Sequence, residues 1–367
     1  MKTLPQRYYT DVEVFRREME MFFFKGWICA GRAEDIPQTG DYFLREVADE
    51  SVIVVRDGNG GVRAHYNVCR HRGTRMCSVS SGNLSGRIQC PYHGWTYGLD
   101  GRLLGAPHMS GTDFEPEKYP LHRVETGIWD GHIFLHLDDR AKSLREQLGE
   151  LPEKFAAWRM GDLRLHRRIT YELAANWKLV ILNYNECLHC PLLHPSLNRL
   201  TDYLGSDNES PSANYVGGAM GFRGGAETMS TDGKRRREYL PGLSEQERAK
   251  VYYYAIYPNL LLSLHPDYMM VHRLWPKAVD RTTVECEWFF DPDEMSRAGF
   301  TADDAIEFWD RTNREDWEIV ELSQLGIQSR KYSPGPYSQR ESLLCAFEQA
   351  IVERERSNVN SNGDLAR

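Results

Sequence analysis

Two short segments of this chain each pair a cysteine with a histidine, and they constrain the fold more than any other feature. Cys69-Arg70-His71 and Cys90-Pro91-Tyr92-His93 are separated by 18 residues. A zinc finger usually keeps its two cysteines together and its two histidines together, whereas both pairs here are mixed. Mixed pairs suit a [2Fe–2S] cluster in which each of two loops gives one thiolate to one iron and one imidazole to the other. A zinc knuckle, or four unrelated residues, is the alternative.

The residues around these loops have the pattern of a compact antiparallel β unit from residue 40 to about residue 140. Ser51–Arg56 and Val62–Asn67 are rich in valine or alternate in polarity, and residues 57–60 between them predict a hairpin turn. Ile128–Leu137 predicts a further strand. Ahead of this unit, Thr10-Asp11-Val12-Glu13 has the form of a capping box and predicts an N-terminal helix.

A second group of metal-binding side chains lies between residues 186 and 194. Glu186 and His189 are three residues apart, so on a helix they share a face. His189 and His194 are five apart, about 140° around an ideal helix with about 3.6 residues per turn. They can therefore meet at one metal only where the helix is distorted or ends, and Pro191, which removes a backbone donor, favours such a break. The same segment contains a Cys-x-x-Cys, Cys187 to Cys190, which by itself is compatible with zinc or redox chemistry.

A third ligand is expected from outside this segment. Thr301–Gln324 predicts a helix with its first residue as the N-cap, and Asp316 lies on the same face as Trp309 and Val320. An acid on an apolar face needs a partner when it is buried. Two histidines and one carboxylate form the facial triad of non-haem Fe(II) oxygenases, which leaves positions open for O₂. A salt bridge to a core arginine is the alternative for Asp316.

Together these motifs resemble the Rieske non-haem iron oxygenase α subunits, the aromatic-ring-hydroxylating oxygenase family. Residues 69–97 are similar to the oxygenase branch of Rieske proteins, and Asn176-Trp177-Lys178 leading into Glu-x-x-His-x-x-x-x-His is similar to the catalytic domain. The resemblance implies a [2Fe–2S] Rieske cluster, a mononuclear Fe(II) and O₂ as co-substrate. The implied ligands are Cys69, His71, Cys90 and His93 for the cluster, and His189, His194 and Asp316 for the mononuclear iron.

The resemblance also implies a catalytic role for Glu186, as the electron-transfer bridge between His189 and His93 of a neighbouring subunit in a head-to-tail homotrimer. Many family members have aspartate at this position, whereas this chain has glutamate. The motif Glu-Cys-x-His-Cys-Pro-x-x-His-Pro at residues 186–195 resembles the branch that acts on choline, carnitine and glycine betaine. Respiratory Rieske proteins carry two further bridging cysteines. Here Tyr92 precedes His93 and Cys77 has no evident mate, so Cys77 is expected to be a buried spectator thiol.

The implied fold is α+β. A β-rich Rieske [2Fe–2S] domain at residues 38–155 is inserted into a helix-grip-like catalytic domain, an antiparallel sheet covered by helices, at residues 1–37 and 156–350. Residues 351–367 are polar and lack periodicity, which predicts a flexible tail.

Composition excludes several other classes of protein. The net charge of −8 argues against a nucleic-acid partner, and the basic run Lys234–Arg237 is interpreted as a solvated loop. No apolar run is long enough for a membrane helix, and the N-terminus does not resemble a signal peptide. A cytoplasmic location is therefore expected, where the eight cysteines would be free or metal-bound rather than disulfide-paired.

The expected function is that of a terminal oxygenase. No nucleotide-binding motif is recognisable, so a separate NAD(P)H-dependent flavin/iron–sulfur reductase, or a ferredoxin, is expected to supply electrons. The enzyme would mono-oxygenate, and so N- or O-demethylate, a small molecule such as a quaternary or tertiary amine. Hydroxylation or dioxygenation of an aromatic ring is the alternative. Rivals of other classes are a Rieske electron carrier and a structural zinc protein.

The aromatic residues of the catalytic half have two interpretations. They form a cation–π cage for a quaternary ammonium, or they pack within the core as the faces of strands. The candidates are Tyr252, Tyr253, Tyr254, Tyr257, Tyr268 and Trp275. Their spacing does not decide between these two interpretations.

Metal and acid-labile sulfide analysis separates the three classes. An oxygenase is expected to contain about three irons and two sulfides per chain, whereas an electron carrier contains about two of each. Zinc without sulfide would contradict the iron–sulfur interpretation.

Overall fold

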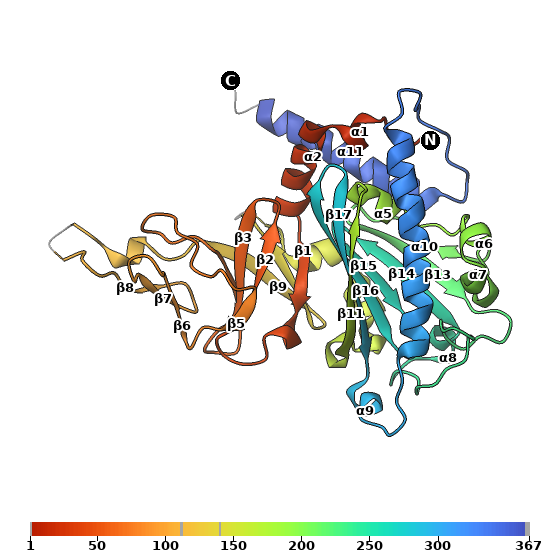
Figure 1. Ribbon diagram of the computed structural model, residues 1–367, viewed down its shortest axis with the longest axis horizontal. Helices are drawn as coiled ribbons and strands as arrows, with labels where there is room; N and C mark the ends of the chain where they lie inside the picture. Colours follow the sequence, from red (N-terminus) through yellow and green to blue (C-terminus); the bar gives the residue numbers. More distant parts are fainter. Residues whose placement is uncertain (1, 111–112, 139–140, 364–367) are drawn as a thin grey trace. The chain divides into compact units, whose positions relative to one another are not determined.

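The computed structural model describes residues 2–110, 113–138 and 141–363, which divide into two compact units. One unit is Phe23–Glu146, and the other combines Met1–Phe22 with Gln147–Arg367. The first is thus inserted into the second, as predicted for the α+β fold (Figure 1). Its limits differ from 38–155, because β1 (Ile28–Arg32) pairs antiparallel with β10 (His132–His136) and so belongs to the inserted unit.

The inserted unit holds two antiparallel sheets. The larger has the strand order β1-β10-β9-β4-β3-β2-β5, and the smaller has the order β6-β7-β8. The remaining elements are β2 (Asp41–Val47), β3 (Glu50–Arg56), β4 (Val62–Tyr66), β5 (Ser81–Asn83), β6 (Arg87–Gln89), β7 (Thr96–Gly98), β8 (Leu103–Gly105), β9 (Arg123–Trp129) and α3 (Leu144–Leu148). Short 3₁₀ turns lie at Ala33–Asp35 and Pro116–Lys118.

The core of the inserted unit anchors the two cysteine-bearing loops. Ile53 and Val55 of β3 share one buried cluster with Cys69, Cys90 and Trp95. The predicted β3–β4 hairpin is confirmed, and its turn is closed by a buried aspartate, Asp57, whose Oδ1 accepts the backbone N–H groups of residues 59 and 61.

The single strand predicted at 128–137 is instead a hairpin. Asp130 and Gly131 both have positive φ, 43° and 82°, which is the conformation of a two-residue hairpin turn. This turn separates β9 from β10, with Trp129 opposite His132.

The catalytic unit is built on one antiparallel sheet of order β11-β17-β16-β15-β14-β13-β12. Its strands are β11 (Arg164–Leu173), β12 (Asp207–Asn208), β13 (Tyr215–Gly221), β14 (Lys250–Ile256), β15 (Leu260–Leu264), β16 (Met269–Ala278) and β17 (Arg281–Phe290). Its helices are α1 (Arg7–Thr10), α2 (Val12–Glu18), α4 (Leu151–Lys154), α5 (Trp177–Tyr184), α6 (Cys190–Leu193), α7 (Pro195–Leu200), α8 (Glu245–Arg248), α9 (Pro292–Met295), α10 (Asp303–Ile327) and α11 (Ser342–Gly363). A π-helical turn at Met19–Phe24 follows α2, and 3₁₀ turns lie at Ala156–Trp158 and Met160–Asp162. Within the described ranges, none of the helices combines the length and the apolar character needed to cross a bilayer.

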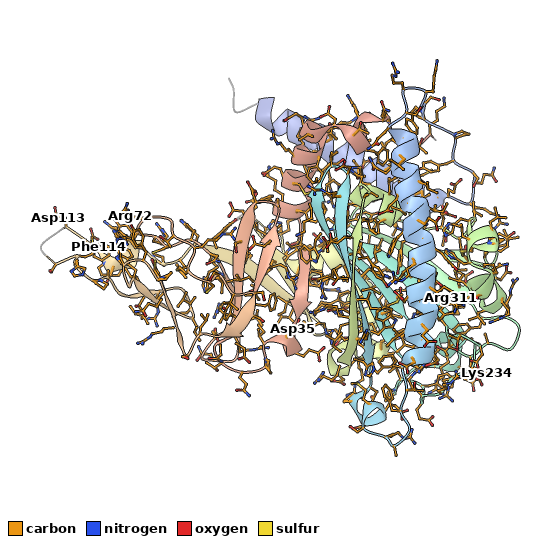
Figure 2. The ribbon with its side chains drawn as sticks, in the orientation of Figure 1. Asp35, Arg72, Asp113, Phe114, Lys234 and Arg311 are labelled. Carbon is orange, nitrogen blue, oxygen red and sulfur yellow. A yellow bond between two sulfur atoms is a disulfide. The ribbon has the colours of Figure 1, made fainter. Side chains whose placement is uncertain are left out.

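Helix α10 carries Asp316, the acidic ligand expected from outside the histidine segment. It packs against α5 and β11, and α5 in turn packs against β16, whose first eight residues are all buried (Figure 1). Trp309, Thr312 and Val320 lie on the buried face of α10, and Arg311 is exposed on this helix (Figure 2). The helix therefore presents its apolar face, as its periodicity predicted, to the sheet side of the unit.

Several predicted elements shift or divide in the structure. The aromatic-rich stretch 250–264 forms two paired strands, β14 and β15, and Pro258, which has no N–H to continue the ladder, lies between them. The N-cap of α2 is Asp11 rather than Thr10, since the Asp11 carboxylate accepts the N–H groups of residues 13 and 14. At α10 the N-cap is Ala302, and the Thr301 hydroxyl accepts the Asp303 N–H.

The prediction of a flexible tail at 351–367 is wrong for residues 351–363, because α11 continues to Gly363. Arg354 lies over the Phe22 ring and donates to Asn214 Oδ1, and Glu355 accepts a hydrogen bond from Tyr8. These contacts with residues distant in sequence hold a polar helix in place. Residues 364–367 lie outside the described ranges.

The basic run at 234–237 is not wholly solvated. The Arg237 side chain is buried, and its guanidinium donates to Asp267 Oδ2 at 3.0 Å and Asp304 Oδ1 at 2.6 Å. A buried charge is stable only when paired, and two carboxylates pair this one. The run therefore attaches its loop to the start of α10.

The N-terminal segment is joined to α5 by a buried ion pair that offers a test of the fold. Lys178 Nζ lies 2.6 Å from Glu18 Oε2, with both side chains excluded from solvent. We expect Lys178→Met to destabilise the protein by about 3–5 kcal/mol, because it leaves a buried carboxylate without its cation. Denaturant unfolding followed by near-ultraviolet circular dichroism measures the change.

The matched control is the exposed pair Arg16–Glu13 on α2. Arg16→Met is expected to change stability by no more than about 0.5 kcal/mol. Adding Glu18→Gln to Lys178→Met is expected to restore most of the loss, and equal effects of the buried and exposed substitutions would contradict the argument.

Candidate metal centres

The two cysteine-bearing loops of the inserted unit have the same backbone construction. In each, the cysteine N–H donates to the carbonyl five residues later, and a glycine four residues later donates back to the cysteine carbonyl. These glycines, Gly73 and Gly94, have φ values of +74° and +72°, which side chains with a Cβ rarely adopt. The repeated construction brings two equivalent loops together.

The four predicted cluster ligands meet where these loops meet. The Cys69 and Cys90 side chains are both buried and lie in hydrogen-bonding contact. Burial is the main cause that raises the pKa of Cys90, and the contact with Cys69 raises it further. The rings of His71 and His93 lie 4.6 Å apart between centroids, with His71 exposed and stacked on Trp95. Two adjacent buried thiols beside two adjacent imidazoles fit the donor set of a Rieske [2Fe–2S] cluster.

Tyr97 adds a polar contact that sequence reasoning missed. Its hydroxyl lies 3.4 Å from Cys69 Sγ and accepts the Arg70 N–H at 3.1 Å. Hydrogen bonds to cluster sulfur tune the reduction potential. Cys77, by contrast, is a buried free thiol, as expected, and burial raises its pKa to about 11.

The mononuclear site is built where the helical path of the chain is interrupted. Helix α5 ends at Tyr184, and the four-residue α6 follows, with His189 as its N-cap and His194 as its C-cap. The two histidines therefore flank one short helical turn, and neither lies inside a regular helix, so the angle of an ideal helix does not keep them apart. Their rings lie 5.2 Å apart between centroids.

Asp316 of α10 lies at the same point as these histidines. Its Oδ1 is 2.9 Å from His194 Nε2 and 3.4 Å from His189 Nε2. One ligand atom from each of the three residues lies within 4.8 Å of the others. The alternative, a salt bridge from Asp316 to a core arginine, is not what the structure shows. Two imidazoles and one carboxylate around one point fit a facial iron triad.

Each of these three side chains is oriented by a further polar group. Glu186 Oε1 accepts from His189 Nδ1 at 2.5 Å, and Glu315 Oε2 accepts from His194 Nδ1 at 2.6 Å. Asn183 Nδ2 donates to Asp316 Oδ1 at 3.0 Å. With Nδ1 donating to a carboxylate, each imidazole directs Nε2 to the shared point. The roles of Glu315 and Asn183 were missed, although Glu315 adjoins Asp316 and Asn183 precedes Glu186 by three residues.

The charges of this cluster favour a cation. Burial lowers the pKa of His189, but hydrogen bonds to Asp316 and Glu186 outweigh burial and raise that pKa to about 9. Burial raises the pKa of Asp316, yet its contacts with the two histidines lower it overall. A divalent metal satisfies the same electrostatic demand as the protons on these groups.

The Cys-x-x-Cys of this segment is a disulfide. We expected all eight cysteines to be free or metal-bound, whereas Cys187 and Cys190 are bonded, with their Cα atoms 5.0 Å apart. The turn that leads into α6, in which the Cys190 N–H donates to the Cys187 carbonyl, brings the two side chains together. The bonded pair cannot serve as two zinc thiolates.

The three side chains open onto a cavity that is lined by residues of α5, α10 and the neighbouring strands β13 and β14. Aromatic residues Tyr184, Tyr203, Tyr253 and Trp309 line it. Of the six candidate cage residues, Tyr253 alone is among the lining residues of the described chain. Because side chains alternate along β14, Tyr252 and Tyr254 point to the opposite face and pack on Phe155.

Both units of the chain match known protein domains. Residues 26–120 match the Rieske [2Fe–2S] domain, and residues 160–356 match the catalytic domain of the ring-hydroxylating alpha subunit. The chain is 31% identical to the glycine betaine monooxygenase oxygenase subunit of Pseudomonas aeruginosa, over 92% of this chain and 85% of that protein.

Solved structures show the same architecture. The quaternary ammonium Rieske monooxygenase CntA in complex with substrate L-carnitine superposes with a TM-score of 0.78 at 27% identity, over 96% of this chain and 94% of that one. Naphthalene 1,2-dioxygenase from Rhodococcus sp. bound to indole also superposes with a TM-score of 0.78, at 21% identity over 96% and 94% of the two chains, which shows a shared fold.

The contact between Glu315 and His194 generates a test of the mononuclear site. We expect Glu315→Ala to weaken iron binding about 10–100-fold, because His194 loses the carboxylate that orients its ring. Titration of the iron-depleted protein with Fe(II) under anaerobic conditions measures the affinity. Glu318→Ala, on an exposed position of the same helix, is the control. Equal iron affinity of the two variants would show that Glu315 does not position the ligand.

Proposed function

The chain belongs to the family of ring-hydroxylating oxygenase α subunits that carry a Rieske [2Fe–2S] domain, and from that membership we propose that its substrate is a small quaternary ammonium compound. It is an oxidoreductase with a [2Fe–2S] cluster, a mononuclear iron and O₂ as co-substrate. The observation that carries the substrate proposal is the aromatic cavity onto which His189, His194 and Asp316 open. The relatives that act on glycine betaine and carnitine support it.

The cavity suits a methylated ammonium because two of its aromatic residues have their polar groups hydrogen-bonded within the protein. The Trp309 indole N–H donates to the Tyr268 hydroxyl at 2.7 Å, and the Tyr184 hydroxyl donates to the Leu262 carbonyl at 2.9 Å. Ring faces attract a cation that has no N–H to donate. Their apolar edges also exclude water from the reacting carbon.

The proposed ligands divide the work between two centres. Cys69, His71, Cys90 and His93 would hold the cluster, and His189, His194 and Asp316 would hold the iron. When bound, the cluster supplies single electrons and the mononuclear iron supplies the site of O₂ reduction. Glu186 fixes the His189 ring by accepting from Nδ1, and Glu315 does the same for His194.

The proposed reaction removes a methyl group. One oxygen atom of O₂ enters a methyl C–H bond and the other leaves as water, with consumption of two electrons and two protons. The hydroxymethyl product then breaks its C–N bond, the hydroxyl proton passes to the nitrogen, and formaldehyde and a protonated tertiary amine are released. The aromatic rings would orient one methyl group towards the triad.

Electrons come from another protein, since the chain's relatives are oxygenase subunits. We propose an NAD(P)H-dependent flavin/iron–sulfur reductase or a ferredoxin as that donor, in the cytoplasm. We also propose a homotrimer in which Glu186 bridges His189 to His93 of a neighbouring subunit. A carboxylate that accepts from two imidazoles would couple the two centres, and in this chain Glu186 already holds one of them.

The substrate proposal is tested with the iron-loaded enzyme and a surrogate reductase. We expect glycine betaine or carnitine to support O₂ uptake with an equal amount of formaldehyde, measured together by an oxygen electrode and a colorimetric assay. Aromatic ring hydroxylation is the second candidate, because the same cavity could enclose a flat apolar ring. Turnover of aromatic compounds alone, without formaldehyde from either amine, would favour it.

The bridging role of Glu186 has its own test. Glu186→Gln is expected to retain iron at both centres and lower coupled turnover by at least about 10–100-fold, because the carboxylate contact is weakened. Glu307→Gln, on an exposed position of α10, is the control. Metal analysis and formaldehyde assays are compared for the two variants, and near-normal turnover of Glu186→Gln would remove the bridge assignment.

A further inference from the structure

One cationic side chain, Arg340, lines the cavity and comes from a segment that contains none of the metal-centre residues. Arg340 lies in the segment between α10 and α11, and its guanidinium donates to the Leu204 carbonyl at 2.9 Å. In the described part of the chain, no carboxylate pairs with it. Its remaining N–H groups are thus available to an anion.

The other charged groups of the cavity are already engaged. Glu186 holds His189, and Asp316 faces both His189 and His194. Arg340 is therefore the one charged side chain of the lining, within the described ranges, that is not part of the metal centre. Arg340 is exposed to solvent as well as lining the cavity. Its guanidinium repels a simple cation and attracts a carboxylate.

The aromatic rings form a separate group within the same cavity. The Tyr253 ring centroid lies 6.0 Å from that of Tyr184 and 6.2 Å from that of Trp309. Trp309, Thr312 and Asp316 are spaced along one face of α10, so this group adjoins the metal centre. The cavity thus combines ring faces beside the triad with a guanidinium contributed by a different segment.

We propose that Arg340 binds a carboxylate of the substrate, so that the enzyme selects zwitterionic betaines over singly charged quaternary amines such as choline. The inference rests on the proposed function and specifies its substrate class. Arginine offers a planar pair of N–H donors that matches a carboxylate, and the aromatic group receives the trimethylammonium. With both ends held, one methyl group is directed to the metal centre.

The test compares two substrates that differ in the carboxylate. The kcat/KM for glycine betaine and for choline is measured by formaldehyde release in the wild type, Arg340→Gln and Arg340→Lys. We expect Arg340→Gln to lower kcat/KM for glycine betaine roughly 10–100-fold, chiefly through KM, because a charge-assisted hydrogen bond is lost. For choline, the kcat/KM of Arg340→Gln should equal or exceed that of the wild type. For glycine betaine, the kcat/KM of Arg340→Lys should lie between those of the wild type and Arg340→Gln. Calorimetric titration with glycine betaine should show the same loss of affinity.

Arg311→Gln is the matched control, since Arg311 is exposed on α10 and does not line the cavity (Figure 2). If Arg340→Gln changes both substrates equally, or neither, the inference is overturned while the proposed function stands. If the wild type releases formaldehyde from neither compound nor from carnitine, the proposed function fails and the inference fails with it.

Discussion

The candidate mononuclear metal centre depends on one carboxylate oxygen that faces two imidazoles. Asp316 Oδ1 lies 2.9 Å from His194 Nε2 and 3.4 Å from His189 Nε2, although Asp316 follows His194 by 122 residues. This contact requires α10 to pack against α5 and requires the chain to leave the helix after Tyr184. The fold of the catalytic unit therefore places the face of α10 that carries Asp316 beside the segment after α5 that carries the two histidines.

The groups behind the triad explain why it has a defined geometry before any metal binds. Glu186 and Glu315 each accept from the Nδ1 of one histidine, and Asn183 donates to Asp316. These contacts fix the tautomer and the ring orientation, and their combined negative charge favours a cation at the centre. At the other centre, the cysteine loops obtain the same preorganisation from backbone hydrogen bonds and two glycines of positive φ.

Local pattern predicted most of the elements, because hairpin turns, helical periodicity and metal-ligand spacing act over a few residues. The β3–β4 hairpin and the α10 helix are confirmed, and the alternation along β14 explains why Tyr253 alone of its three tyrosines reaches the cavity. Two of the failures depended on distant contacts, because the buried pairing of Arg237 with Asp267 and the continuation of α11 arise from neighbours far along the chain. The disulfide at Cys187 is different, since its partner Cys190 is only three residues away and the Cys-x-x-Cys pattern left zinc and redox chemistry open.

The sequence by itself determined which metal centres the chain can hold, since two mixed Cys/His pairs and a Glu-x-x-His-x-x-x-x-His restrict the metals that can bind. Through the family that these motifs identify, it also determined the oxygenase class. Tertiary structure alone decided which side chains line the cavity beside the three clustered residues. Arg340, Tyr203 and Trp309 come from three segments far apart in the chain. Their proximity follows from the packing of α10 and the loops on one sheet, and a cavity is a property of such packing rather than of any one segment.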